Sequence, residues 1–218
     1  MQFLYHKFAL DNKIFLEKEE FLHLKVRRIK ENEIIKLRNL KDDYLYSYKI
    51  ENIKKNSCEL ILIDKILLKS NKSNFSIALS IIDNKILEKT LPFLNELGLD
   101  KLILVYAKFS QKSFKIDLNR LHRILISSCE QCGRSYLMDI EFFDDLYSFL
   151  DIYPQAIMVD FTGKKSSFED KDKLYFIGPE GGFDDEERKL FKNIIKLKSP
   201  HILRSQTACI ALVAKNLI

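Results

Sequence analysis

One glycine-rich stretch constrains the fold of this chain more than any other: Ile177-Gly178-Pro179-Glu180-Gly181-Gly182-Phe183. A short apolar run precedes it at residues 174–177, and four acidic residues follow it at 184–187. Glycine serves positions where φ is positive or where a ligand approaches the backbone. A strand, a glycine-rich bend and a helix in this order predict a ligand-binding crossing of an α/β sheet. The alternative interpretation is a tight turn that needs glycine for its backbone alone.

Phosphate fits this bend poorly. The stretch is not GxGxxG, and it lacks the Gly-Lys-Ser/Thr sequence of a phosphate loop. The four carboxylates that follow suit the positive end of a helix dipole, but they would repel a phosphate. Asp184 is a candidate helix N-cap with Glu187 three residues later, which is the spacing of a capping box. We therefore expect a ligand with little negative charge that is recognised by backbone groups.

The composition is that of a folded protein. The chain has 218 residues, of which 46% are hydrophobic, enough for one large or two small domains. Its apolar runs are short, so no membrane span is predicted, and its start lacks the long apolar region of a signal peptide, so we expect a cytoplasmic protein. Cys129 and Cys132 form a C-x-x-C pair without further ligands at metal-binding spacing, so we predict no metal site.

The net charge of +5 is unevenly distributed. Residues 1–74 contain 16 Lys and Arg against 11 Asp and Glu, whereas residues 75–218 contain 20 of each kind. This asymmetry indicates an N-terminal module that faces a polyanion. Within it, Arg27 and Arg28 end a predicted helix and could contact phosphates. The alternative is an ordinary lysine-rich surface on which these side chains are simply solvated.

Two regions with different patterns are predicted. Residues 1–70 are β-rich and predict a small barrel, with strands at 33–38, 44–50 and 58–63, a turn at 39–43 and a helix at 21–28. The polar residues 69–74 mark a domain boundary. Beyond it, strands at 75–82, 102–106 and 156–161 alternate with helices, which predicts a largely parallel α/β sheet. Helices are expected at 84–97 and 119–132, stopped by Gly98 and Gly133. Two more are expected at 184–197 and 205–218, the last with Ser205 as its cap.

Four motifs in a fixed order give the chain a family resemblance. They are the stretch at 177–183; Ile202-Leu203-Arg204-Ser205-Gln206-Thr207-Ala208; Glu96-Leu97-Gly98, with Glu88 upstream; and Glu130-Gln131-Cys132-Gly133-Arg134. Together they resemble the RsmE family, bacterial 16S ribosomal RNA uridine N3-methyltransferases of the SPOUT class. The sequence departs from that family at Lys198-Ser199, where Leu-Gly is usual, and at Gln206, where Glu is usual. The final helix also ends sooner than is usual there, so we expect a shorter dimer helix.

The resemblance implies an α/β fold in which a trefoil-knotted SPOUT methyltransferase domain, residues 75–218, follows a PUA-like β-barrel domain, residues 1–70. It implies a homodimer that methylates N3 of a specific uridine in 16S rRNA of the small ribosomal subunit, with no membrane association. The implied cofactor is S-adenosyl-L-methionine. The residues that the resemblance implies for binding it are Phe161, Ile177, Gly178, Glu180, Gly181, Gly182, Ile202, Leu203 and Arg204. Candidate RNA-binding residues are Arg27, Arg28 and Arg134.

Arg204 is the candidate catalytic residue, because its guanidinium could stabilise the uracil anion that forms when N3 loses its proton. The alternative is that Arg204 only shapes the knot. Glu180 is a weak candidate for general base unless its pKa is raised. Two other functions remain open, since a fold does not fix a substrate. One is methylation of a different RNA, and the other is RNA binding without catalysis.

Overall fold

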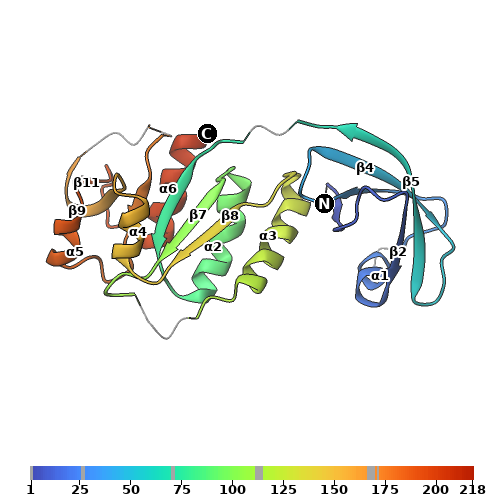
Figure 1. Cartoon of the computed structure of the whole chain (residues 1–218), viewed down its shortest axis with the longest axis horizontal. Helices are drawn as coiled ribbons and strands as arrows, with labels where there is room; N and C mark the ends of the chain where they lie inside the picture. The colour runs from blue at the N-terminus through green and yellow to red at the C-terminus, as the bar shows by residue number, and fades with distance from the viewer. Residues whose placement is uncertain (1, 26–27, 70–71, 111–114, 166–169, 171) are drawn as a thin grey trace. The chain divides into compact units, whose positions relative to one another are not determined.

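The computed structural model describes residues 2–25, 28–69, 72–110, 115–165, 170 and 172–218 (Figure 1). The chain divides into two compact units. Unit 1 comprises Met1–Asn71 and Ile126–Leu137, and unit 2 comprises Lys72–Leu125 and Met138–Ile218. Each unit has its own sheet and its own hydrophobic core.

Unit 1 contains a five-stranded sheet in the order β1-β3-β4-β5-β2. Its elements are β1 (Leu4–Tyr5), β2 (Lys13–Glu17), α1 (Lys18–Lys25), β3 (Ile34–Arg38), β4 (Tyr44–Glu51) and β5 (Ser57–Leu67). The pairs β3–β4, β4–β5 and β2–β5 are antiparallel, and β1 runs parallel to β3. The three strands predicted from the sequence are confirmed as β3, β4 and β5, whereas β1 and β2 were missed.

Alternation of side chains along β4 builds the core of unit 1. Tyr46, Tyr48 and Ile50 are fully buried on one face of the sheet. The two tyrosine hydroxyls are satisfied there, because that of Tyr46 donates to Asp42 Oδ2 at 2.8 Å and that of Tyr48 donates to a backbone carbonyl at 2.7 Å. The predicted helix at 21–28 overlaps α1, which begins earlier, at Lys18, and is described to Lys25; residues 26 and 27 of the prediction lie outside the described residues.

The motif at Glu130 has a structural role within unit 1. The Glu130 carbonyl accepts a hydrogen bond from the Gln2 N–H at 2.8 Å, and its Oε1 accepts one from the Tyr5 N–H at 2.7 Å. Gly133 follows at φ +88, a conformation that suits glycine and that ends the helix, as predicted. Glu130 therefore holds the first residues of the chain in place.

Unit 2 is built on a six-stranded parallel sheet in the order β11-β9-β10-β6-β7-β8. The strands are β6 (Ser76–Ser80), β7 (Lys101–Val105), β8 (Asp139–Phe143), β9 (Ile157–Lys165), β10 (Tyr175–Ile177) and β11 (Asn193–Lys196). The helices are α2 (Asn84–Glu96), α4 (Leu146–Ile152), α5 (Asp185–Leu190), α6 (Ser205–Leu217) and the first half of α3 (Leu118–Cys132), whose residues from Ile126 onward belong to unit 1. The predicted alternation of strands and helices is confirmed.

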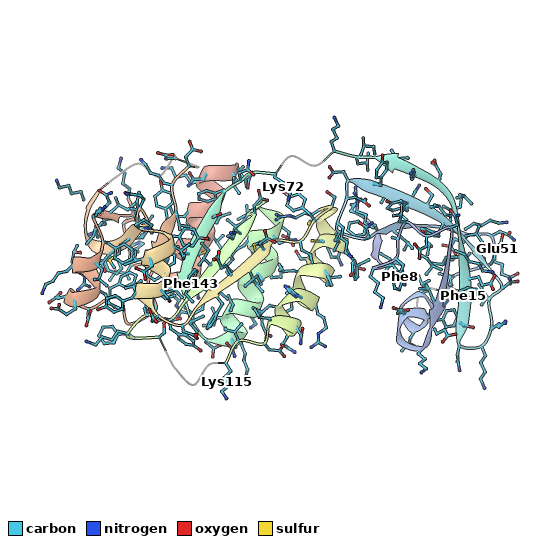
Figure 2. The ribbon with its side chains drawn as sticks, viewed as in Figure 1. Phe8, Phe15, Glu51, Lys72, Lys115 and Phe143 are labelled. Atoms are coloured by element: carbon cyan, nitrogen blue, oxygen red, sulfur yellow. The ribbon has the colours of Figure 1, made fainter. Side chains whose placement is uncertain are left out.

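Aromatic side chains fill much of the core of unit 2 (Figure 2). Phe149, Phe183 and Phe191 all pack against the fully buried Phe176 of β10, with ring centroids 5.2 to 5.7 Å apart. Phe143, labelled in Figure 2, extends this cluster through an edge contact with Phe149. The cluster fixes the chain on both sides of α5, because Phe183 precedes this helix and Phe191 follows it.

The helix predicted at 184–197 is wrong in its second half. Helix α5 ends at Leu190, and β11 follows as the edge strand of the sheet. Phe191 turns inward to stack on Phe176, and the β-branched Ile194 and Ile195 then pair with β9. Helix α2 continues through Pro92, although proline lacks the backbone N–H that a helix interior uses. Strand β8 and helix α4 were not predicted.

Candidate functional site

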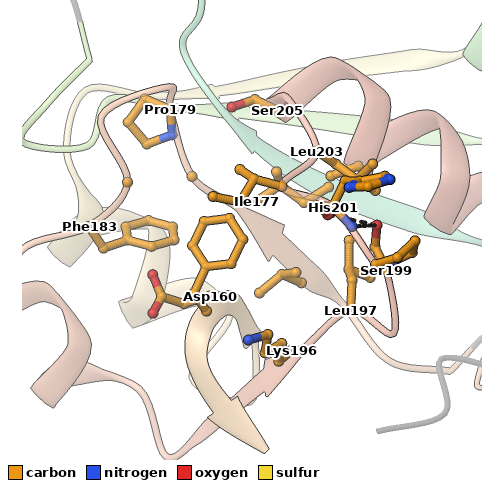
Figure 3. Close-up of a pocket in the computed structure, with 17 residues that line it drawn as sticks. Asp160, Ile177, Pro179, Phe183, Lys196, Leu197, Ser199, His201, Leu203 and Ser205 are labelled. Atoms are coloured by element: carbon orange, nitrogen blue, oxygen red, sulfur yellow. Dashed lines mark hydrogen bonds between the residues drawn. The ribbon is translucent and has the colours of Figure 1, made fainter. Parts of the chain in front are cut away.

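Three segments that are far apart in the sequence meet around one pocket of unit 2 (Figure 3). They are the bulged part of β9, the glycine-rich bend after β10, and the stretch from the end of β11 to the start of α6. The lining residues are Val159, Asp160, Phe161, Ile177, Gly178, Pro179, Gly182, Phe183, Lys196, Leu197, Ser199, Pro200, His201, Ile202, Leu203, Ser205 and Ala208. Most of these side chains are apolar.

The bend requires glycine at two positions for different reasons. A Cβ on Gly178 would lie 2.8 Å from the ring of Phe183, so only hydrogen fits there. Gly182 has φ +71, which suits glycine, and its N–H donates to the Pro179 carbonyl at 2.9 Å. The bend therefore brings bare backbone to the pocket between Ile177 and Phe183.

The β9 wall is a long bulge. In the pairing of β9 with β11, Met158 pairs with Ile194 and the next pair joins Lys164 to Ile195. Residues 159–163 of β9 are therefore not paired with β11. The bulge places Asp160 and Phe161 in the wall of the pocket. Gly163 closes it, because a Cβ there would lie 2.5 to 2.6 Å from the Ile195 backbone. Gly163 was not among the residues predicted from the sequence, although a lone glycine after an apolar strand is a known signal of a bulge.

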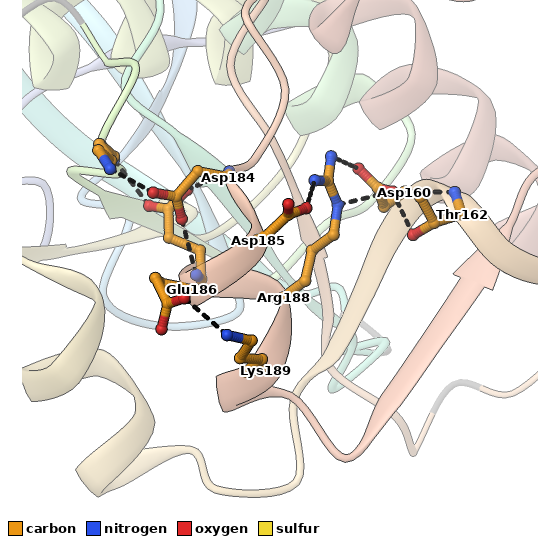
Figure 4. Close-up of polar contacts among 9 residues, drawn as sticks. Asp160, Thr162, Asp184, Asp185, Glu186, Arg188 and Lys189 are labelled. Carbon is orange, nitrogen blue, oxygen red and sulfur yellow. Dashed lines mark hydrogen bonds and ion pairs between the residues drawn. The ribbon is translucent and has the colours of Figure 1, made fainter.

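A buried carboxylate joins the β9 wall of the pocket to α5 (Figure 4). Asp160 Oδ1 accepts hydrogen bonds from the Thr162 N–H at 2.9 Å and the Thr162 hydroxyl at 2.6 Å. Arg188 of α5 donates to both oxygens of Asp160 at 3.3 Å and also to Asp185 at 2.9 Å. Burial alone would raise the pKa of Asp160, but the hydrogen bonds from Thr162 and Arg188 outweigh it and lower that pKa.

The start of α5 has the predicted capping box. Asp184 Oδ1 accepts from the Glu187 N–H at 2.8 Å, and Glu187 Oε2 accepts from the Asp184 N–H at 3.1 Å. Lys108 forms an ion pair with Asp184, and its backbone N–H donates to Glu187 Oε1 at 2.7 Å. The ion pair lowers the pKa of Asp184. These carboxylates are therefore engaged in holding the bend.

Six of the nine predicted cofactor residues line the pocket: Phe161, Ile177, Gly178, Gly182, Ile202 and Leu203. The other three, Glu180, Gly181 and Arg204, lie on the same segments but are not among the lining residues, and each is exposed. Arg204 is the N-cap residue of α6. Its guanidinium forms no hydrogen bond or ion pair with the residues that the structure describes.

Ser205 is not the helix cap that the sequence indicated. It is the first residue of α6, it is buried, and it lines the pocket. Ser199, one of the departures from the family pattern, holds the loop locally: its hydroxyl donates to the His201 carbonyl at 2.7 Å and accepts from the His201 N–H at 3.2 Å. Gln206, the other departure, has a buried Oε1 without a partner among the described residues.

The candidate RNA-binding arginines lie in unit 1. Arg27 is outside the described residues. Arg28 is exposed and has φ +55, a left-handed conformation. The guanidinium of Arg134 lies over the ring of Tyr136, with its carbon 4.3 Å from the ring centroid.

Comparison with known proteins agrees with this architecture. A family model described as an RNA methyltransferase domain matches residues 69–216, and one described as an RNA methyltransferase PUA domain matches residues 16–63. The fold and its pocket thus define an RNA methyltransferase with a PUA-like N-terminal domain, as predicted. The chain belongs to the family of ribosomal RNA small subunit methyltransferase E, the RsmE family.

Three relatives illustrate the range of similarity. The small subunit methyltransferase E of Helicobacter pylori strain J99 is 43% identical over 96% of both chains. That of Rickettsia conorii is 26% identical over 96% of this chain and 91% of its own. The crystal structure of the Neisseria gonorrhoeae enzyme, bound to S-adenosyl methionine, has a TM-score of 0.82 at 22% identity over 98% of this chain and 96% of that one.

Two further findings bear on the site. The described residues contain no group of three or more His, Cys, Asp or Glu side chains that could hold a metal ion, and none of the four cysteines forms a disulfide within this part of the chain. Within the same residues, every helix is too short or too polar to cross a bilayer.

Proposed function

We propose that this protein transfers a methyl group from S-adenosyl-L-methionine to N3 of a specific uridine in 16S rRNA, acting on the small ribosomal subunit in the cytoplasm. Its family membership supports this proposal, since its relatives carry the name small subunit methyltransferase E. The observation that carries it is the meeting of two motifs, residues 177–183 and 202–208, in a single pocket.

The chemistry of the pocket fits this cofactor. An adenine needs apolar contact on its faces and backbone groups at its edge. Ile177, Leu203 and Ala208 offer apolar contact, and the glycine-rich bend offers backbone groups. Ile202 and Leu203 lie outside any helix or strand. The residues that we propose to hold the cofactor are Phe161, Ile177, Gly178, Glu180, Gly181, Gly182, Ile202, Leu203 and Arg204.

When bound, S-adenosyl-L-methionine supplies a methyl group on a sulfonium, which a nucleophile attacks in line. The nucleophile is N3 of uracil, which must lose its proton. Loss of that proton leaves negative charge on O2 and O4 of the base. We assign stabilisation of that charge to the Arg204 guanidinium, which is exposed beside the pocket and has no partner among the described residues. Residues of the pocket wall contribute mainly by positioning.

Several finer features belong to the same proposal. We propose a homodimer, a trefoil knot in the methyltransferase domain, and domain limits at 1–70 and 75–218. Arg27, Arg28 and Arg134 are proposed to contact RNA. Arg28 is exposed and its side chain is accessible for such contact.

The test is to incubate the purified protein with unmethylated small ribosomal subunits and labelled S-adenosyl-L-methionine, and then to locate the modified base by mass spectrometry of nuclease fragments. We expect one N3-methyluridine per 16S rRNA. Label in a different RNA or on a different base would contradict the assigned substrate, and absence of transfer to any RNA would contradict the assigned activity.

A further inference from the structure

The charges of unit 2 are segregated along the sequence. Residues 139–187 contain 14 Asp and Glu against 4 Lys and Arg. Residues 188–218 contain 7 Lys and Arg and no acidic residue. The balanced charge of the C-terminal two thirds therefore conceals an acidic stretch followed by a basic one.

The pocket lies where these two stretches meet. One side follows the glycine-rich bend into α5, where Asp184, Asp185 and Glu186 open the helix. The other side is the segment 196–204, whose charged residues are Lys196, Lys198 and Arg204. Figure 3 shows Phe183, which precedes α5, and His201, which belongs to the basic segment, on different sides of the pocket.

The two sides also differ in whether their charges are paired. On α5, Asp184 pairs with Lys108, Asp185 with Arg188 and Glu186 with Lys189. On segment 196–204, the side chains of Lys196, Lys198 and Arg204 form no ion pair with any residue that the structure describes. Lys198 and Arg204 are exposed, and Lys196 reaches the pocket wall. With respect to the described residues, this segment therefore presents uncompensated positive charge beside the pocket.

We infer that segment 196–204 binds the phosphate backbone of the RNA substrate, so that the RNA reaches the pocket across this segment and not across α5. This inference rests on the proposed function. Uncompensated lysine and arginine side chains bind phosphates by releasing condensed counterions. The basic side chains on and beside the start of α5 are already paired with its carboxylates, so within the described part of the chain the opposite side of the pocket offers phosphates no comparable positive charge. We assign phosphate binding to Lys198 in particular. It lies on the segment but does not line the pocket, so its replacement should affect RNA binding without affecting the cofactor.

The inference is tested by the salt dependence of binding to small ribosomal subunits, with potassium chloride varied at constant magnesium. The logarithm of the association constant falls linearly with the logarithm of the salt concentration. Loss of one phosphate contact to single-stranded RNA makes this slope less steep by about 0.7, which is roughly a fivefold loss of affinity at 0.1 M salt. We expect this change for Lys198→Gln and a larger one for Lys196→Gln/Lys198→Gln. Lys198→Arg should retain most of the affinity.

Lys189→Gln is the matched control, because it removes the same charge from an exposed side chain on α5. We expect less than a twofold loss of subunit affinity from it. An equal loss in Lys189→Gln and Lys198→Gln, an unchanged slope in the double variant, or absence of wild-type binding to subunits would each overturn the inference. Calorimetry with S-adenosyl-L-methionine should give the wild-type affinity for Lys198→Gln, and a reduced affinity would also overturn it.

Failure of the proposed function has a different signature. In that case the wild-type protein forms no N3-methyluridine, whether or not its binding to subunits depends on Lys198. Methylation by the wild type with subunit binding that is insensitive to Lys196 and Lys198 would refute only the inferred RNA path.

Discussion

Gly163 of β9 lies so close to the backbone of Ile195 in β11 that no side chain fits between them. A Cβ on Gly163 would be 2.5 Å from the Ile195 carbonyl carbon and 2.6 Å from its Cα and N. Backbone atoms cannot rotate away as a side chain can, so the two strands would have to separate. This contact closes the bulge that places Asp160 and Phe161 in the pocket wall.

Gly163→Ala is therefore expected to lower the free energy of unfolding by about 1–3 kcal/mol, the usual cost of overpacking. It should also weaken binding of S-adenosyl-L-methionine, because the bulge forms one wall of the pocket. Urea unfolding and calorimetry measure the two effects. Lys164→Ala is the control, since that exposed neighbour should change the unfolding free energy by less than about 0.5 kcal/mol. Wild-type stability in Gly163→Ala would show that β9 and β11 tolerate separation.

Gly178→Ala tests the second close approach, which involves a side chain and not backbone. The new Cβ would lie 2.8 Å from the Phe183 ring, and that ring packs against Phe176 in the core. We expect a lower melting temperature and weaker cofactor binding. Replacing the Phe183 ring by the smaller leucine, in Gly178→Ala/Phe183→Leu, should restore part of the cofactor affinity that Gly178→Ala loses. If the loss of cofactor affinity in the double variant equals the sum of the losses in Gly178→Ala and Phe183→Leu, the contact with the Phe183 ring is not the cause of the Gly178→Ala effect.

Asp160→Asn is expected to destabilise the protein at neutral pH. It removes the buried one of the two carboxylates that pair with the partly exposed Arg188 guanidinium and leaves only the exposed Asp185, at a cost of about 1–3 kcal/mol. The folded-state pKa of Asp160 is lowered, so its contribution is complete above the unfolded pKa of about 3.9. That contribution is lost as the pH falls through the folded pKa.

The measurement is the unfolding free energy of the wild type and Asp160→Asn between pH 7 and pH 3. The difference should be constant from pH 7 to about pH 5 and should shrink below about pH 4. A difference that grows toward low pH would have the wrong sign for a carboxylate with a lowered pKa.

Arg204→Ala is expected to reduce kcat by about 10²- to 10³-fold, the usual effect of removing one donor that stabilises developing negative charge. Because Arg204 lies beside the pocket and is not one of its lining residues, the loss of affinity for S-adenosyl-L-methionine should be smaller than the loss of turnover. Single-turnover methylation and calorimetry separate the two quantities. Equal losses in turnover and cofactor affinity would instead assign Arg204 the role of shaping the loop.

Local patterns predicted those parts of the fold that depend on local interactions. The alternating tyrosines of β4, the glycine stops after α2 and α3, and the capping box at Asp184 all form as expected. The helix at 184–197 was wrong, because its end depends on a distant partner: Phe191 stacks on Phe176. The adjacent β-branched residues Ile194 and Ile195 were the available signal for the strand.

Apart from Phe161, the candidate site was predicted where a motif marks it. The bend at 177–183 and the pair Ile202 and Leu203 were recognised, whereas Asp160 was not. The role of Asp160 depends on a bulge and on Arg188, and both arise from strand register and tertiary packing. Charge counts over large regions likewise concealed the basic segment beside the pocket.

The central claim is that the bend at 177–183 and the segment at 202–208 form one pocket for S-adenosyl-L-methionine. Calorimetric titration of the purified protein with this cofactor tests that claim most directly, together with the variant Leu203→Asp, which places a carboxylate in an apolar wall, and the exposed control Phe93→Asp on α2. We predict one binding site per chain, at least a tenfold loss of affinity in Leu203→Asp, and wild-type affinity in Phe93→Asp. Absence of binding by the wild-type protein, or binding that is unaffected in Leu203→Asp, would contradict the account.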